Sequence, residues 1–175
     1  KGCERCRTKQ EHKDQLLFII QYIRKRKETY KRKFIMQTFQ RDLKRGKHHE
    51  HVVLDAIKSK YKNAYIKDGY CKEYDIFVPE VNFGVEVKSD EKSKYTNNIV
   101  IEIEFNNKPS ALSTTQAKYW VIYDGYNYNW FLTNKIKECI KDNKLKFVEF
   151  IGNGDTKSKK AYLIKKNILY KYKEL

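Results

Sequence analysis

The spacing of apolar residues changes near Ala64, from a helical period to that of short strands. Before this point apolar residues recur three and four positions apart, which predicts amphipathic helices. After it, short runs rich in Val, Ile, Tyr and Phe are bounded by turn residues, which predicts strands. The predicted helices are Asp14–Arg26, Thr29–Arg45 (with Gly46 as its stop), His48–Tyr61 and Thr133–Asp142. The predicted strands are Ala64–Ile66, Glu73–Pro79, Asn82–Lys88, Asn98–Phe105, Tyr119–Tyr123, Tyr128–Phe131, Phe147–Ile151 and Tyr162–Ile164.

This order of elements predicts the fold class. Helices come first, a set of strands that form a mixed sheet follows, and a helix with edge strands closes the chain. The expected class is α/β or α+β, and 175 residues suit one domain with a modest appendage. We expect a basic helical extension over residues 1–45 and a core over residues 46–175.

Charge adds the first functional information. The chain carries 38 Lys and Arg against 22 Asp and Glu, a formal net charge of +16. Such an excess favours polyanions, and nucleic acid above all, because each neutralised phosphate releases counterions. The densest basic positions are expected to contact phosphate, with a solvated helix face as the alternative. They are Arg24, Lys25, Arg26, Lys31, Arg32 and Lys33.

The sequence also excludes some classes of protein. No apolar run approaches the roughly 18 residues of a membrane span, and no signal peptide is recognised. We therefore expect an intracellular protein, neither secreted nor membrane-bound. Cys3 and Cys6 form a CxxC that would supply half of a Zn²⁺ site, while a reduced N-terminus without metal is the alternative.

Two acids and a lysine form the main chemical candidate. Glu86 and Lys88 are two residues apart on one predicted strand, so they point to the same face, and Asp75 lies on the preceding strand. If the two strands pair as a hairpin, the three side chains converge. The acids could hold Mg²⁺ and the lysine could polarise a water or a phosphate oxygen. A polar hairpin surface is the alternative.

Further acids could complete this site. Glu102 and Glu104 alternate with isoleucines and are expected to share one face of their strand, with Glu102 the better site candidate. Glu50 lies on the third predicted helix and could face the same metal. His48 or His51 could serve as ligands instead, although oxygen suits Mg²⁺ and Mn²⁺ better than imidazole suits Mg²⁺.

A polar segment over residues 108–120 could cradle a phosphate with hydroxyls, backbone N–H groups and lysines, and a structural turn is the alternative. The candidate residues are Lys108, Ser110, Thr114, Thr115 and Lys118. No Walker loop, dinucleotide-binding glycine pattern or nucleophile elbow is found.

Asp75 followed by Glu86-Val-Lys88, after a helical Glu50, resembles the PD-(D/E)XK nuclease superfamily. The segments 98–102 and 107–120 are similar to those of its phage and viral members. The resemblance covers residues 46–165. It implies a restriction-endonuclease-like core, with a four- to five-stranded mixed sheet flanked by helices, that binds one or two Mg²⁺ or Mn²⁺ ions.

By this resemblance, Asp75, Glu86 and Glu50 ligate metal and Lys88 orients the attacking water or stabilises the developing charge. Departures from the pattern are Tyr74 before Asp75, Asn97 in place of a glycine, and Ala111 in place of the second glycine of the turn. The changes at Asn97 and Ala111 affect the predicted phosphate-binding turn more than the predicted metal site.

Three functional hypotheses follow. The first is a metal-dependent DNA endonuclease. The second is an RNA endonuclease of the viral cap-snatching type, in which His48 or His51 takes part. The third is a nucleic-acid-binding module that no longer cuts. Many relatives act as homodimers so that both strands are cut, and a viral member would act in the host cytoplasm or nucleus.

Overall fold

The computed structural model describes residues 4–69, 71–152 and 155–174, and for many residues before position 40 it describes the helical backbone alone. Contacts between residues group the chain into two compact units, residues 1–41 and residues 42–175. The first unit contains most of helix α1. The second contains the last turns of that helix together with every strand.

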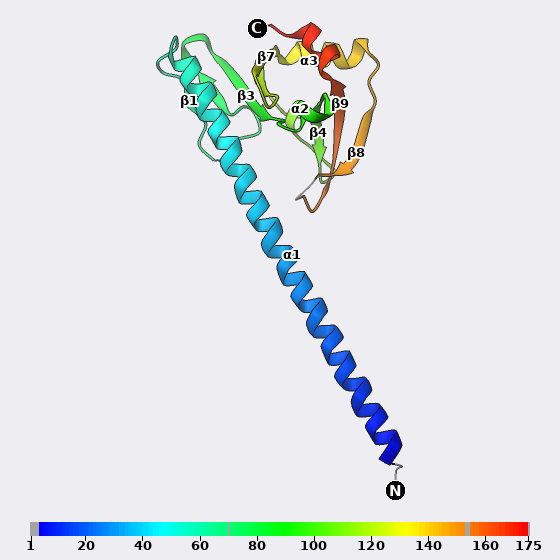
Figure 1. The fold of residues 1–175 in the computed structure, drawn as a ribbon. Helices are drawn as coiled ribbons and strands as arrows, with labels where there is room; N and C mark the ends of the chain where they lie inside the picture. Colours follow the sequence, from blue (N-terminus) through cyan, green and yellow to red (C-terminus); the bar gives the residue numbers. More distant parts are fainter. Residues whose placement is uncertain (1–3, 70, 153–154, 175) are drawn as a thin grey trace. The chain divides into compact units, whose positions relative to one another are not determined.

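Helix α1 runs without a break from Glu4 to Lys58, and Figure 1 shows it as one ribbon from blue to cyan. The prediction of three separate helices, the second of which stops at Gly46, was wrong. Glycine ends a helix by taking a left-handed backbone, and among the described glycines only Gly69 and Gly125 do so. Inside a helix a glycine costs only about 1 kcal/mol, which good helix formers on both sides can offset. The proposed division after residue 45 stays a prediction, since α1 passes through it.

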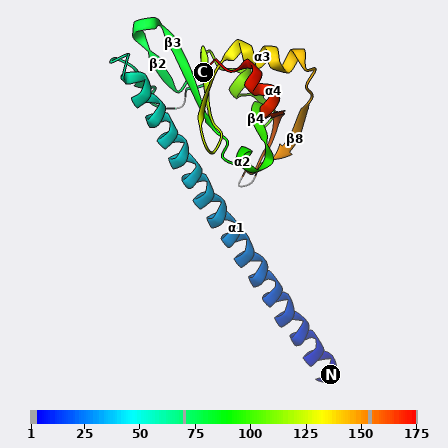
Figure 2. The same ribbon diagram turned by 45° about the horizontal axis from the view of Figure 1, so that its top comes forward.

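A five-stranded mixed sheet confirms the predicted mixed fold. Strands β3 and β6 pair in parallel, and the other neighbours in this sheet pair antiparallel. Figure 2 shows β2 and β3 side by side at one end of this unit. In spatial order the strands are β1 (Tyr65–Ile66), β2 (Ile76–Val78), β3 (Phe83–Ser89), β6 (Tyr119–Tyr123) and β7 (Tyr128–Leu132).

A second sheet of four strands is antiparallel throughout. In spatial order its strands are β5 (Lys108–Pro109), β4 (Asn98–Phe105), β9 (Ser158–Lys165) and β8 (Phe147–Ile151). The remaining helices are α2 (Ser93–Thr96), α3 (Thr133–Asp142) and α4 (Lys166–Leu169), with 3-10 turns at Pro79–Val81, Ala111–Ser113 and Tyr170–Tyr172. The predicted strands are all found, β9 is longer than expected, and β5 was not expected.

A bulge in β4 overturns one expectation from the sequence. Glu102 and Glu104 were expected to share a face, but the register shifts between them. Glu102 lies opposite Ala161 and Glu104 lies opposite Lys160 on β9. Because Ala161 and Lys160 are neighbours on one strand, they point to opposite faces, and so do the two glutamates.

The five-stranded sheet separates two hydrophobic cores. On β3, Val85 and Val87 belong to the core that includes Leu54 and Ile57 of α1. On β6, which pairs with β3, Trp120 faces the other core together with α3 and the second sheet. Alternation along β3 therefore places Glu86 on the Trp120 side and away from the valines.

Gly84 on β3 makes room for an aromatic ring. A Cβ atom placed on Gly84 would lie 2.6 Å from the Cγ and Cδ1 atoms of Tyr74, closer than real Cβ contacts allow. The ring therefore packs directly on the backbone of the strand. Gly46 differs, because a Cβ there would meet nothing within 4 Å.

We predict that Gly84→Ala lowers the free energy of unfolding by about 1–3 kcal/mol, because the half-buried ring of Tyr74 must shift to admit the methyl group. Gly46→Ala is the matched control and should raise stability by about 0.5–1 kcal/mol through helix propensity. Urea unfolding of the two variants measures both effects. Equal stability of Gly84→Ala and the parent chain would contradict the close packing.

Candidate active site

The β2–β3 hairpin places Asp75 beside β3. Its register pairs Ile76 with Val85, and Asp75 directly precedes β2. The backbone N–H of Asp75 donates to the carbonyl of Val85 at 3.0 Å. Its carboxylate accepts a hydrogen bond from the N–H of Val87 at 2.7 Å. The expected hairpin is therefore present, with the Asp75 carboxylate held against the strand that carries Glu86.

Lys88 and Glu86 form a close ion pair on β3. The Lys88 Nζ lies 2.6 Å from Glu86 Oε1, as their spacing of two along a strand predicts. The Glu86 side chain is 9% exposed and the Lys88 side chain 39% exposed. The Lys88 side chain is therefore partly exposed, while the carboxylate of Glu86 stays within the protein.

These groups line a cavity of about 720 Å³. Glu50 of α1 contributes to its wall, so the structure brings the helix acid to the same cavity as the hairpin acids. Sequence-predicted residues that line it are Glu50, His51, Asp75, Glu86, Lys88, Glu102, Ser110 and Thr114. Lining residues that the sequence did not indicate include Lys47, Lys67, Cys71, Lys72 and Tyr74.

Burial makes the acids of the cavity reluctant to ionise. Desolvation raises the pKa of Glu50, of Asp75 and of Glu86 above their ordinary values, although Lys88 opposes this shift at each acid. For Lys88, burial lowers the pKa, but attraction to Glu86 and Asp75 outweighs it and the net pKa is raised. The cavity thus places three acids of raised pKa near the ammonium of Lys88.

Glu102 faces the cavity but is already engaged. The Ser110 hydroxyl donates a short hydrogen bond to Glu102 Oε1, and Lys159 Nζ lies 3.4 Å from Oε2. Lys159 also contacts Asp155 at 2.9 Å. No sequence pattern pointed to Lys159, because its approach to Glu102 depends on the long-range pairing of β4 with β9. Glu104 instead pairs with Lys160 at 2.8 Å.

The residues of the segment expected to bind phosphate do not all lie at the cavity. The Thr115 hydroxyl lies within hydrogen-bond distance of Glu86 Oε2, at 3.4 Å, and of the Glu73 carbonyl, at 3.0 Å. Lys118 extends over the rings of Phe83 and Tyr119. Lys108 is exposed on β5. Neither Lys108 nor Lys118 lines the cavity wall.

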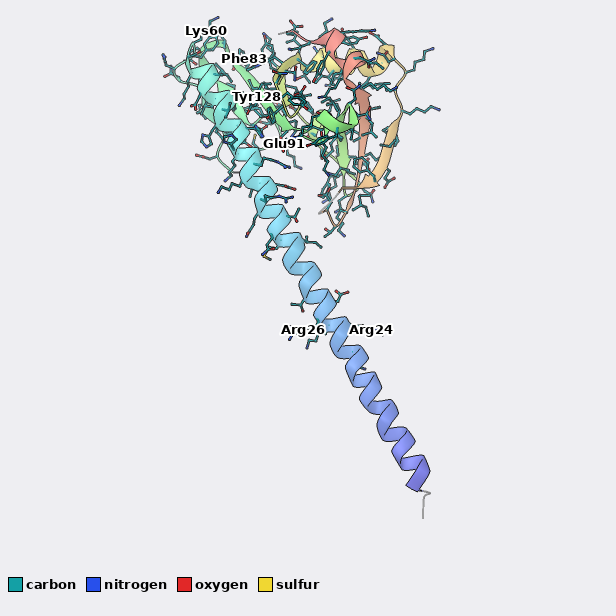
Figure 3. All side chains as sticks on the ribbon, in the orientation of Figure 1. Arg24, Arg26, Lys60, Phe83, Glu91 and Tyr128 are labelled. Atoms are coloured by element: carbon teal, nitrogen blue, oxygen red, sulfur yellow. The ribbon has the colours of Figure 1, made fainter. Side chains whose placement is uncertain are left out.

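The basic N-terminal candidates lie on α1. Arg24, Lys25 and Arg26 are exposed in the first unit, and Figure 3 labels the two arginines. The side chains of residues 31–33, and with them the predicted contacts of Lys31, Arg32 and Lys33, lie outside the described residues. The same holds for Cys3 and Cys6 and their proposed Zn²⁺ site. Within the described ranges, no helix is long and apolar enough to cross a membrane.

The donor set suits a hard cation in chemistry, because carboxylate oxygens are the ligands that Mg²⁺ and Mn²⁺ prefer. As they stand, the described His, Cys, Asp and Glu side chains form no group of three arranged around one point. Asp75 and Glu86 each have an oxygen engaged by a donor, the N–H of Val87 and the ammonium of Lys88. Binding of an ion would therefore need some of these side chains to move closer together.

Comparison of the chain with models of protein families, with curated proteins and with solved structures gave no match. The PD-(D/E)XK resemblance therefore stays an expectation from the sequence.

His49 anchors the turn of α1 that carries Glu50. Its Nδ1 atom shares a 2.7 Å hydrogen bond with the Tyr128 hydroxyl, and its ring stacks on Tyr123 at 4.5 Å between centroids. The Nε2 atom lies 3.6 Å from a carboxylate oxygen of Glu91. Figure 3 labels Tyr128 and Glu91 beside this part of α1. Because His49 is 5% exposed, it fixes the rotation of the helix, and Glu50 is directed to the cavity.

Burial lowers the pKa of His49 below its ordinary value of 6.5, although Glu91 acts in the opposite direction. The unfolded chain therefore takes up a proton at this residue before the folded chain does as the pH falls. We predict that the free energy of unfolding decreases as the pH falls below 6.5, and that His49→Gln removes this part of the pH dependence. Urea unfolding from pH 8 to pH 5 measures it. His48→Gln, at an exposed neighbouring position, is the control and should leave most of the dependence in place, because burial is the largest cause of the shift at His49.

Proposed function

We propose that this protein is a divalent-metal-dependent endonuclease that hydrolyses phosphodiester bonds in DNA. The observation that carries the proposal is the cavity in which Asp75, Glu86 and Glu50 meet Lys88. Burial raises the pKa values of these acids, so the positive charge around them does not fully stabilise their ionised forms. A divalent cation would supply that charge, and phosphodiester hydrolysis is a reaction that such a cation can promote.

The carboxylates of Asp75 and Glu86 would hold the cation, with Glu50 as the third ligand from α1. When bound, Mg²⁺ or Mn²⁺ supplies a water of lowered pKa and neutralises charge on a phosphate oxygen. The protein's own contribution is to fix these oxygens. The Val87 N–H holds Asp75, the Thr115 hydroxyl lies beside Glu86, and His49 sets the direction of Glu50.

Lys88 would act on the phosphate. Its pKa is raised, so it stays protonated at neutral pH and can donate to the attacking water or to a phosphoryl oxygen that gains charge. Its side chain is partly exposed, so the ammonium would be able to leave Glu86 when the carboxylate turns to a cation. Ser110 and Thr114, in the same wall, offer hydroxyls to the remaining phosphate oxygens.

Charge supports a nucleic-acid substrate. The net charge of +16 and the exposed residues Arg24 and Lys25 favour binding to phosphates along a strand. Lys47, Lys67 and Lys72 line the cavity itself, so positive charge also surrounds the acids. We propose that the activity lies inside the cell.

RNA is the second candidate substrate, and one observation favours it. His51 lines the cavity next to Glu50, where an imidazole could take part in the cleavage of RNA. Digestion of DNA and RNA of one sequence, with Mg²⁺ and then with Mn²⁺, separates the two proposals. For a DNA endonuclease we predict that His51→Ala changes the rate of DNA cleavage by less than about threefold. Faster RNA cleavage that His51→Ala abolishes would favour RNA.

We predict that Asp75→Asn and Lys88→Ala each lower the rate of cleavage about a hundredfold or more, because each removes a charge that acts on the transition state. Binding of nucleic acid should change little, since many other cations contact phosphate. Asp75→Asn should not lower the free energy of unfolding, because it removes a charge that is costly to bury. Cleavage of plasmid DNA, with urea unfolding alongside, measures these effects.

Glu104→Gln is the matched control. Glu104 is also the acid of an acid–lysine pair, formed with Lys160, but it does not line the cavity. The variant should cut at the rate of the parent chain. Calorimetric titration with Mn²⁺ tests the metal separately, and Asp75→Asn should weaken the binding. Nucleic-acid binding without any Mn²⁺ binding would instead favour a module that no longer cuts.

A further inference from the structure

Three aromatic rings extend from the cavity across the hairpin and onto β1. Tyr74 lines the cavity and directly precedes Asp75. Its ring stacks on Phe77 of β2 with 5.2 Å between centroids and 25° between planes. The Phe77 ring meets Tyr65 of β1 at 6.0 Å and 65°. We refer to Tyr65, Phe77 and Tyr74 as the aromatic shelf.

The shelf lies on the same face of the sheet as Glu86. Phe77 pairs with Gly84 and Tyr65 pairs with Phe77, so these positions share a face. Glu86 follows Gly84 by two residues on β3 and points to that face as well. The absence of a side chain on Gly84 lets the Tyr74 ring sit there. The backbone is thus built to hold a stack of rings that begins beside the acids.

The outer end of the shelf is open. Tyr65 is 43% exposed and Phe77 is partly exposed. Lys67 and Lys72 are exposed and line the same cavity as Tyr74. Flat apolar rings with ammonium groups beside them match the two parts of a nucleotide, because bases stack on aromatic side chains while lysines contact phosphates.

We propose that the aromatic shelf stacks an unpaired nucleobase, so that the protein acts on single-stranded or locally unpaired nucleic acid. This inference rests on the proposed function and names the substrate class of the same site. A base inside a duplex has its faces covered by its neighbours, and only an unstacked base can present one to a protein ring. The shelf would hold such a base while the adjoining phosphate enters the cavity.

The test measures binding of the full chain, in EDTA, to fluorescent oligonucleotides by anisotropy. The probes are a 12-nucleotide oligo-dT, an abasic strand of the same length, and a blunt hairpin duplex. We expect the oligo-dT to bind more tightly than the abasic strand. Tyr65→Ala and Phe77→Leu should weaken binding of oligo-dT by roughly tenfold and leave binding of the abasic strand unchanged.

Two variants control for structural effects. Tyr65→Phe keeps the ring and should bind oligo-dT as the parent chain does. Tyr95→Ala removes a tyrosine that is 80% exposed on α2, outside the cavity wall, and should change nothing. Because Tyr65 is exposed, the comparison of its Ala and Phe variants stands even if Phe77→Leu fails to fold.

Other outcomes overturn the inference in distinguishable ways. Equal affinity of the parent chain for oligo-dT and the abasic strand would refute base stacking on the shelf. An equal loss of affinity for both strands in Tyr65→Ala would do the same. Either result would leave the endonuclease proposal standing. A change of oligomeric state in Tyr65→Ala, with unchanged affinity for oligo-dT, would assign the shelf to a contact between copies. If no probe binds, the shelf and the nucleic-acid substrate both fail. Ring-dependent binding without cleavage in Mg²⁺ or Mn²⁺ would refute the endonuclease alone.

Discussion

The register between β2 and β3 is the constraint on which the proposed site depends. Side chains alternate along a strand, so a slip of one residue would turn Glu86 and Lys88 into the core that Val85 and Val87 now fill. Burial of charge there would be far more costly than burial of valine. The hydrophobic face therefore fixes the position of the polar face. The same valines pack against α1 and so help to place Glu50 as well.

The site is held in an unfavourable electrostatic state. Three acids with raised pKa values lie near Lys88, which opposes the shift at each of them, and the surrounding fold must supply the free energy that keeps them together. Groups that serve only stability are rarely arranged in this way, whereas sites that bind cations or perform catalysis often are. The pair of Asp124 and Lys166, outside the cavity wall, shows the contrast. Burial of Asp124 is offset by several donors, which lower its pKa to about 2.

The sequence predicted which strands carry the site and which face its side chains share, but it did not predict the contacts between residues far apart in the chain. Period-two alternation was sufficient to place Glu86 and Lys88 on one face, and the hairpin followed from two adjacent apolar runs. The unbroken α1 was missed because the local signal of Gly46 is weaker than the helical preference of its neighbours. Lys159 was missed because only the pairing of β4 with β9, about sixty residues apart in sequence, brings it to Glu102. Contacts of that range leave no periodic pattern in the sequence.

The bulge in β4 decides which acids can act in the cavity. A regular strand would present Glu102 and Glu104 together, and two more carboxylates would add repulsion to a site already short of positive charge. The extra residue turns Glu104 away to Lys160 and leaves Glu102 facing inward. Ser110 and Lys159 then engage both oxygens of Glu102, so it is poorly suited to ligate a metal ion. Its remaining influence is on Lys88, whose pKa it helps to raise, although Glu86 and Asp75 contribute more to that shift.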